Sequence, residues 1–291
     1  MTTRRTFSVA AVALPIWECA IGQSFASGPQ IWRVEQRGRV YVFGFGEAKD
    51  RAWLTPSIAD AFDECQTLWL ETPPPGTFPA GVDPDELVRE IGFEEDRSFF
   101  EALEPPVRVR ARAYVDELDI AIETIEPMRP WLGYFTINRA FWSQTQRPDA
   151  REYPEEVLRA MAVESGKTIH YEFPTSADTL RFFASMNDKA QSEYVEMLLD
   201  FLDDEKRGVN EEYFGWVCGN PSDRAIERMR ADTPELYRVI QVERNEWWAA
   251  MIEDLIAAEG AHFVCVGMNH VLGPEGIPRQ LERRGLSASR E

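Results

Sequence analysis

The sequence predicts an α/β protein in which a mixed β-sheet forms the core and many helices surround it. Short runs rich in β-branched and aromatic residues alternate with longer helical blocks along the chain. Hydrophobic residues make up 44% of the 291 positions, which is ample for a sizeable buried core. Two of the strand-like runs recur in a second copy, and this repetition predicts halves related by a pseudo-two-fold axis.

The first half opens with two expected strands, at residues 31–35 and 39–43, joined by a turn that contains Gly38. A helix over 57–65 leads into a buried strand over 67–70, which the proline run at 73–75 ends. Further helices are expected at 83–91, 97–103 and 107–125, before Pro127 and Pro130 break the chain.

The second half is expected to begin with a helix over 153–165, ended by Gly166, and a strand over 168–171. Helices dominate from 176 to 260. The last of them begins at Thr233, a good N-cap, and ends before Gly260. A strand over 262–266 and a short helix over 278–284 complete the prediction.

The repeat pairs two kinds of strand. Residues 67–73 parallel residues 168–174, and each copy ends in a glutamate, Glu71 or Glu172. Residues 40–44, followed by Glu47, parallel residues 263–267, followed by His270. The order is reversed between the halves, as a site on a pseudo-two-fold axis would require. The repeat is short, and chance similarity is the alternative.

Three side chains are candidates for chemistry. Gly267 can adopt unusual backbone angles and would hold His270 near the end of a strand, where ligand sites of α/β proteins lie. Glu71 follows a buried strand, and burying its carboxylate is costly unless it is paired or bound to a metal. The alternatives are a structural histidine hydrogen bond and a solvated glutamate.

Arg244, the third candidate, falls within the apolar stripe of the predicted helix over 233–258, beside Asn245. A guanidinium there must meet a carboxylate, a ligand or carbonyl groups. It can instead extend to solvent at the helix edge. The stripe consists of Leu236, Ile240, Trp247, Trp248, Met251 and Leu255.

Charge excludes some partners. The chain has 31 basic and 50 acidic residues, a formal charge of -19, so nucleic acids and anionic membranes are not expected partners. The acidic stretches at 116–126 and 193–204 are expected to be solvated helix faces. No later segment is apolar and long enough to predict a transmembrane helix.

The N-terminus predicts export. Arg4 and Arg5 form a twin-arginine pattern, an apolar run covers 8–17, and small residues near 24–26 suit signal cleavage. We therefore expect a signal peptide over 1–26, a single domain over 27–291, and a periplasmic or secreted protein. In such a compartment Cys65 and Cys218 can form a disulfide, although the sequence does not decide it.

Taken in order, these motifs resemble the TraB/GumN family, to which the animal Tiki proteases are related. The resemblance rests on the two glutamate strands, on Glu243-Arg244-Asn245, and most of all on the closing Gly267-Met268-Asn269-His270 turn. It covers nearly the whole mature chain. One departure matters: the family's first Gly-x-x-His motif is Gly44-Phe45-Gly46-Glu47 in this chain.

The resemblance implies a metal-dependent hydrolase, with peptidase-like activity on a peptide or small molecule. Glu47, Glu71 and His270 would be the catalytic metal ligands, Arg244 and Asn245 would orient the substrate, and Gly44 and Gly267 would be the turn glycines. Two carboxylates and one imidazole favour Mn²⁺ or Fe²⁺ over Zn²⁺. The alternatives are a non-catalytic family member that binds a peptide or envelope ligand without a cofactor, and a scaffold that uses its acidic helices. The oligomeric state is left open.

Overall fold

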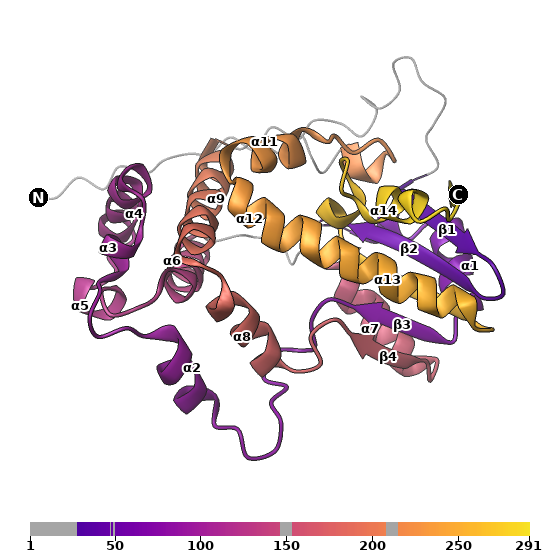
Figure 1. Cartoon of the computed structure of the whole chain (residues 1–291), viewed down its shortest axis with the longest axis horizontal. Helices are drawn as coiled ribbons and strands as arrows, with labels where there is room; N and C mark the ends of the chain where they lie inside the picture. The colour runs from indigo at the N-terminus through magenta and orange to yellow at the C-terminus, as the bar shows by residue number, and fades with distance from the viewer. Residues whose placement is uncertain (1–27, 47, 49, 146–152, 208–214) are drawn as a thin grey trace, which may run out of the picture.

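The computed structural model describes residues 28–46, 48, 50–145, 153–207 and 215–291. Within these residues one mixed sheet has the strand order β4-β3-β5-β2-β1-β6 (Figure 1). Strands β2, β3, β4 and β5 are parallel to one another, whereas β1 is antiparallel to both β2 and β6. This mixed sheet with its many helices confirms the predicted α/β class.

Every predicted strand is present. The strands are β1 (Ile31–Glu35), β2 (Arg39–Phe45), β3 (Thr67–Leu70), β4 (Thr168–Tyr171), β5 (Ala261–Gly267) and β6 (Ala288–Arg290). Strand β6 was not predicted, because its three residues include no β-branched or aromatic side chain. The copies of each repeated strand are neighbours, β3 beside β4 and β2 beside β5. A two-fold relation between the halves stays a prediction.

The two faces of the sheet bury different side chains because successive residues alternate across a strand. Leu68, Leu70 and Cys265 pack on the face covered by α1 (Pro56–Glu64) and α7 (Pro154–Glu164). Val264 and Val266 pack on the other face, against α13 (Arg244–Ala257) and α14 (Ile277–Arg283). Trp69 and His170 therefore lie on the face of α13, and so do the residues two positions away from them along the same strands.

The remaining helices form a second layer beside the carboxyl ends of the parallel strands (Figure 1). Five of them share a core of their own that includes Phe99, Val115, Ile125, Ile137 and Leu198. The bounds are α2 (Pro84–Gly92), α3 (Phe99–Ala102), α4 (Pro105–Glu117), α5 (Ile122–Ile125), α6 (Pro130–Gln144), α8 (Ser176–Ser185), α9 (Asp188–Arg207), α11 (Arg224–Asp232) and α12 (Pro234–Tyr237). Helix α6 was not predicted, because Pro130 is a residue typical of a break in a helix. It instead occupies the first turn, where its missing N–H costs nothing.

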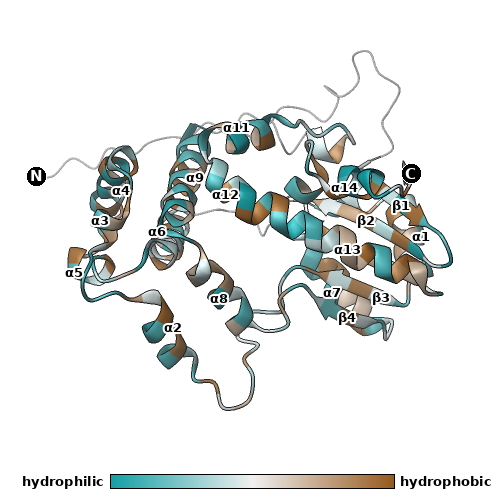
Figure 2. Ribbon diagram, viewed as in Figure 1, coloured by the Kyte–Doolittle hydropathy of each residue, from teal (hydrophilic) through white to brown (hydrophobic). Residues whose placement is uncertain are grey.

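The helix expected over 233–258 is divided by a π-helical segment, η3 (Arg238–Glu243), between α12 and α13. The wider π turn shifts the phase of the helix, so the predicted apolar stripe is right only in part. Leu236 and Trp248 are buried as predicted, whereas Trp247 is 42% exposed. The other buried positions include Tyr237, Gln241, Asn245, Ile252 and Ile256. Hydrophobic and hydrophilic residues alternate visibly along α13 (Figure 2). π-Helical segments occur frequently at functional sites.

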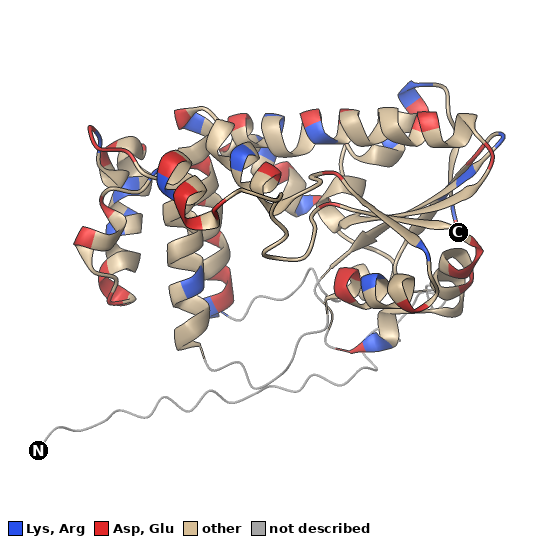
Figure 3. Cartoon of the chain, turned by 90° about the horizontal axis from the view of Figure 1, so that it is seen from below, with Lys and Arg blue, Asp and Glu red and all other residues tan. Residues whose placement is uncertain are grey.

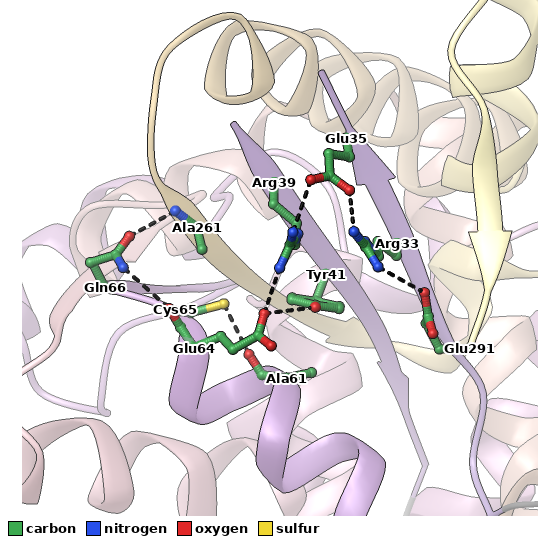
Figure 4. A network of polar contacts seen from close by, with 10 residues as sticks. All are labelled: Arg33, Glu35, Arg39, Tyr41, Ala61, Glu64, Cys65, Gln66, Ala261 and Glu291. Atoms are coloured by element: carbon green, nitrogen blue, oxygen red, sulfur yellow. Dashed lines mark hydrogen bonds and ion pairs between the residues drawn. The ribbon is translucent and has the colours of Figure 1, made fainter. Parts of the chain in front are cut away.

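A polar network ties α1 to the amino end of the sheet (Figure 4). Glu64 accepts hydrogen bonds from Arg39 Nη1 at 2.7 Å and from the Tyr41 hydroxyl at 2.9 Å. Next to it, Cys65 is a free, buried thiol that donates to the Ala61 carbonyl, and burial raises its pKa to about 12. The disulfide with Cys218 that the sequence allowed is therefore not formed.

Acidic and basic residues are interspersed over the helices (Figure 3). Glu193 is buried, although the stretch 193–204 was expected to be a solvated helix face. It is 5% exposed, and its Oε2 accepts the backbone N–H of Leu236 at 2.7 Å. This carboxylate ties α9 to α12. None of the helices in the described part of the chain has the length and apolar character that a membrane span requires.

Gly267 does not adopt the unusual backbone angles that the sequence suggested for it. Neither it nor Gly44 has a positive φ, and Gly267 has φ −53° and ψ 143°, which other residues adopt. They are needed for close approach instead. A Cβ on Gly44 would lie 2.3 Å from Val271 Cγ2, and one on Gly267 would lie 3.3 Å from Glu71 Oε1. The end of β2 is thereby packed tightly against the turn that carries His270.

We expect Gly44→Ala to lower the free energy of unfolding by about 1–3 kcal/mol, because the new methyl group overpacks the contact with Val271. Chemical denaturation measures this change. The same substitution in a Val271→Ala background should cost less, since the clashing methyl groups are gone. Equal costs in the two backgrounds would show that this contact does not limit residue 44.

Candidate functional site

Two glutamates meet beneath α13 at the carboxyl ends of neighbouring strands. Glu71 directly follows β3 and Glu172 directly follows β4, and these strands pair in parallel register. The period of two along each strand places both carboxylates on the face of α13. The carboxyl ends of parallel strands are the usual position of ligand sites in α/β proteins.

Arg244, the first residue of α13, joins the two carboxylates. Its Nε donates to Glu172 Oε1 at 2.8 Å, and its Nη2 donates to Glu172 Oε2 at 2.6 Å. Nη2 also donates to Glu71 Oε2 at 2.6 Å. The indole N–H of Trp248, one turn along α13, adds a bond to Glu172 Oε2 at 3.1 Å. The carboxylate of Glu172 is thus bound on both oxygens.

Glu71 is held from two further directions. Its Oε1 accepts the backbone N–H of Gly267 at 2.6 Å, and His270 Nε2 lies 3.4 Å from its Oε2. Burial favours a higher pKa for this carboxyl, but His270 in its protonated form, the charge of Arg244 and the hydrogen bond from Gly267 outweigh burial and hold the pKa well below its ordinary value. Glu71 is therefore ionised at neutral pH, although its side chain is only 18% exposed.

His270 has a fixed orientation. Its Nδ1 lies 2.6 Å from Asn245 Oδ1, and Asn245 Nδ2 donates to the Glu275 carbonyl at 2.8 Å. Because the amide nitrogen is committed as a donor, Oδ1 must accept, and the ring proton belongs on Nδ1. In the neutral imidazole the Nε2 lone pair then faces Glu71 Oε2. Two electron-rich atoms face one another here, which calls for a cation or a proton between them.

The electrostatic balance of the site also favours a positive ligand. Two carboxylates, on Glu71 and Glu172, face one guanidinium, so the site carries an excess negative charge when the imidazole is neutral. The carboxylates in turn hold the pKa of Arg244 above its ordinary value despite the opposing effect of burial. Arg244 binds both oxygens of Glu172 but only Oε2 of Glu71. Glu71 therefore keeps part of its acceptor capacity free.

The structure brings together Glu71, Arg244, Asn245 and His270, with Gly267 donating to Glu71. Gly44 lies at the end of β2, paired with Val266 of β5. Glu47 lies outside the described residues, so its place in the site stays a prediction. Among the described residues, no group of three histidine, cysteine or acidic side chains has a geometry that would hold a metal.

The chain matches the TraB/PrgY/gumN family over residues 30–290. It belongs to this family. No curated protein and no solved structure matches the chain. Family membership therefore rests on the match across nearly the whole chain, and the roles of individual residues rest on the geometry of this site.

Two residues of this TraB/PrgY/gumN member contribute more than the sequence indicated. Glu172 was not among the three candidate side chains, yet it accepts two hydrogen bonds from Arg244 and Glu71 accepts one. Its parallel position in the repeat was the available signal. Glu155, on α7, was missed. Its Oε1 pairs with Arg159 Nη2 at 2.5 Å, and Arg159 also donates to the Thr72 carbonyl at 3.4 Å. Burial raises the pKa of Glu155 to about 7, although Arg159 opposes this.

Aromatic rings flank the charged groups in this family member. The Arg244 guanidinium carbon lies 5.5 Å from the ring centre of Phe173 and 5.8 Å from that of Phe182. Phe182 belongs to α8, whose Phe183 stacks on Tyr194 of α9 at 5.2 Å between ring centres. The aromatic band connects the site to the helical layer and shields the charges of Arg244 from water.

We expect Arg244→Ala to lower the free energy of unfolding by about 3–5 kcal/mol, because it leaves two buried carboxylates without their shared cation. The matched control is Arg279→Ala, whose side chain is 65% exposed and should contribute less than about 0.5 kcal/mol. Denaturant titration of both variants is the measurement. Similar small losses in the two would contradict the role assigned to Arg244.

The depressed pKa of Glu71 predicts a pH dependence of stability. The folded protein binds this proton less tightly than the unfolded chain, whose carboxyl has the ordinary value of 4.5. The resulting stability is fully present above that pH and is lost as the pH falls through the folded-state pKa. As the pH falls below 4.5, the unfolding free energy of the wild type should therefore fall more steeply than that of Glu71→Gln. Parallel acid profiles would count against the assignment.

Proposed function

We propose that this protein is a metal-dependent hydrolase of peptides, with Glu71 and His270 as metal ligands. The proposal rests mainly on the opposed pair of His270 Nε2 and Glu71 Oε2, 3.4 Å apart at the carboxyl edge of the sheet. Glu47 is proposed as a third ligand from its place in the sequence, two residues beyond the end of β2.

The donors present fit a divalent cation. Asn245 holds the proton on Nδ1 of His270, as the outer partners of metal-bound histidines commonly do, and this leaves Nε2 free to bind. Gly267 and Arg244 fix the Glu71 carboxylate in the same way. With carboxylate and imidazole donors, Mn²⁺ or Fe²⁺ suits the site better than Zn²⁺. When bound, such an ion supplies Lewis acidity for hydrolysis of an amide or ester bond.

The residues of the chain orient the substrate and keep the site dry. Arg244 Nη1 makes no hydrogen bond to any described residue, so it is the donor available to a substrate carbonyl. Phe173 and Phe182 lie beside the guanidinium and limit access of water. Low local polarity strengthens each electrostatic contact that orients the substrate.

The second candidate function is binding of a peptide or envelope ligand without catalysis. The observation that favours it is the ion pair between Arg244 and Glu71, which already supplies a positive charge to that carboxylate. In that case His270 would be protonated, and the imidazolium would satisfy Glu71. The two functions differ in whether the site takes up a metal.

Metal uptake is the deciding test. We expect protein purified without chelator to bind Mn²⁺ near stoichiometrically and His270→Ala to lose it, as measured by isothermal titration calorimetry. His170→Ala is the control, because His170 stacks on Trp69 at 4.4 Å between ring centres and belongs to the packed sheet. Equal binding by all three proteins, or none by the wild type, would contradict the hydrolase and favour the second function.

We also propose that the protein is exported to the periplasm or secreted through the twin-arginine pattern at Arg4 and Arg5. A fusion of residues 1–26 to a reporter should reach the periplasm, and replacing both arginines by lysine should block this. Fractionation of cells followed by immunoblotting measures the outcome. A reporter that is exported equally well with both lysines would contradict the proposal.

A further inference from the structure

Strand β4 is an edge of the sheet in the described part of the chain, and one row of its main-chain groups faces outward (Figure 1). Thr168 N donates to the Gln66 carbonyl at 3.2 Å, and Glu172 N donates to the Leu70 carbonyl at 2.9 Å. In a parallel ladder the residues that bond to the partner strand alternate with those that do not. The N–H and C=O groups of Ile169 and Tyr171 therefore point away from β3.

Apart from its short length of 4 residues, this edge lacks the usual protection. Natural edge strands are commonly guarded by proline, a bulge or a charged side chain. Strand β4 contains no proline and keeps a regular register with β3 through all of its residues. Lys167, which precedes β4 in the sequence, is turned inward, since its Nζ donates to the carbonyls of Cys65 at 2.5 Å and Asp63 at 3.2 Å. All side chains of β4 are at least partly exposed.

The edge leads directly to the candidate site. The residue that follows β4 is Glu172, which binds Arg244. A chain lying along β4 would be about 4.8 Å from it, the ordinary spacing of strands, and about twice that from β3. A few further residues of an extended chain, at roughly 3.3 Å each, span the distance to Glu71.

We propose that an extended segment of a peptide substrate adds to β4 as a further strand and thereby directs the following residues to the site. This inference deepens the proposed function and rests on it, because it takes the bound peptide to be a substrate. The occupant is an extended polypeptide because only another main chain offers alternating donors and acceptors at the spacing of Ile169 and Tyr171. Recognition through the main chain accepts many sequences, while side-chain contacts at Ile169 and Tyr171 favour apolar residues.

The test removes one outward donor without touching the ladder to β3. Ile169→Pro deletes an N–H that points to solvent, a position where proline is tolerated in edge strands. Ile169→Val is the matched control, since it keeps the N–H and the β-branched side chain. The probe is fluorescein-labelled β-casein, an unfolded polypeptide, and binding is followed by fluorescence anisotropy with full-length protein. Thermal unfolding and Mn²⁺ titration of each variant report the integrity of the fold and of the metal site.

We expect Ile169→Pro to bind casein about tenfold more weakly than the wild type, and Ile169→Val to bind like the wild type. As a second measurement, N-methylation of successive residues in a bound casein peptide should weaken binding at every second position only. The inference is overturned if the wild type does not bind casein, if both variants bind it like the wild type, or if the methylation pattern has no period of two.

These results are separable from those of the metal test. A wild type that binds Mn²⁺ through His270, with casein binding unaffected by Ile169→Pro, would overturn the edge and leave the hydrolase standing. Casein binding that depends on the edge, without any Mn²⁺ uptake, would overturn the hydrolase and assign the edge to the second function.

Discussion

The guanidinium of Arg244 holds two buried carboxylates that would otherwise repel each other at the ends of neighbouring strands. The bidentate contact with Glu172 fixes the arginine, and the remaining contact positions Glu71 opposite His270. Each of these groups comes from a different part of the chain: β3, β4, α13 and the turn after β5. The parallel sheet is what brings them together, because it aligns the carboxyl ends of its strands at one edge.

Much of this arrangement could be predicted from local patterns. A hydrophobic run followed by a glutamate identified the ends of β3 and β4, and the strands over 67–70 and 168–171 have the predicted bounds. Arg244 was found because an arginine within an apolar stripe requires a partner, and the structure supplies two. Glu71 and Glu172 have equivalent positions in the repeat, and in the structure they follow neighbouring strands and share Arg244 as their cation.

Other features depend on contacts between distant residues, which local patterns do not encode. The π-helical turn at 238–243 changes which residues of the long helix face inward, and no propensity in those residues indicated it. Gly44 was expected only as a turn glycine, whereas its contact with Val271 at close range depends on the packing of β2 against the turn after β5. Glu155 and Arg159 are an i,i+4 pair within α7, but the contact of Arg159 with the Thr72 carbonyl becomes visible only when α7 packs on the sheet.

The central claim is that His270 carries its proton on Nδ1, toward Asn245, and leaves Nε2 open toward Glu71. The ¹⁵N chemical shifts of its imidazole, measured by NMR at mildly alkaline pH, test this most directly. The account predicts a protonated Nδ1 and an unprotonated Nε2, with the Nε2 resonance shifting when a diamagnetic divalent metal is added. A proton on Nε2, in the neutral or the doubly protonated ring, would contradict it.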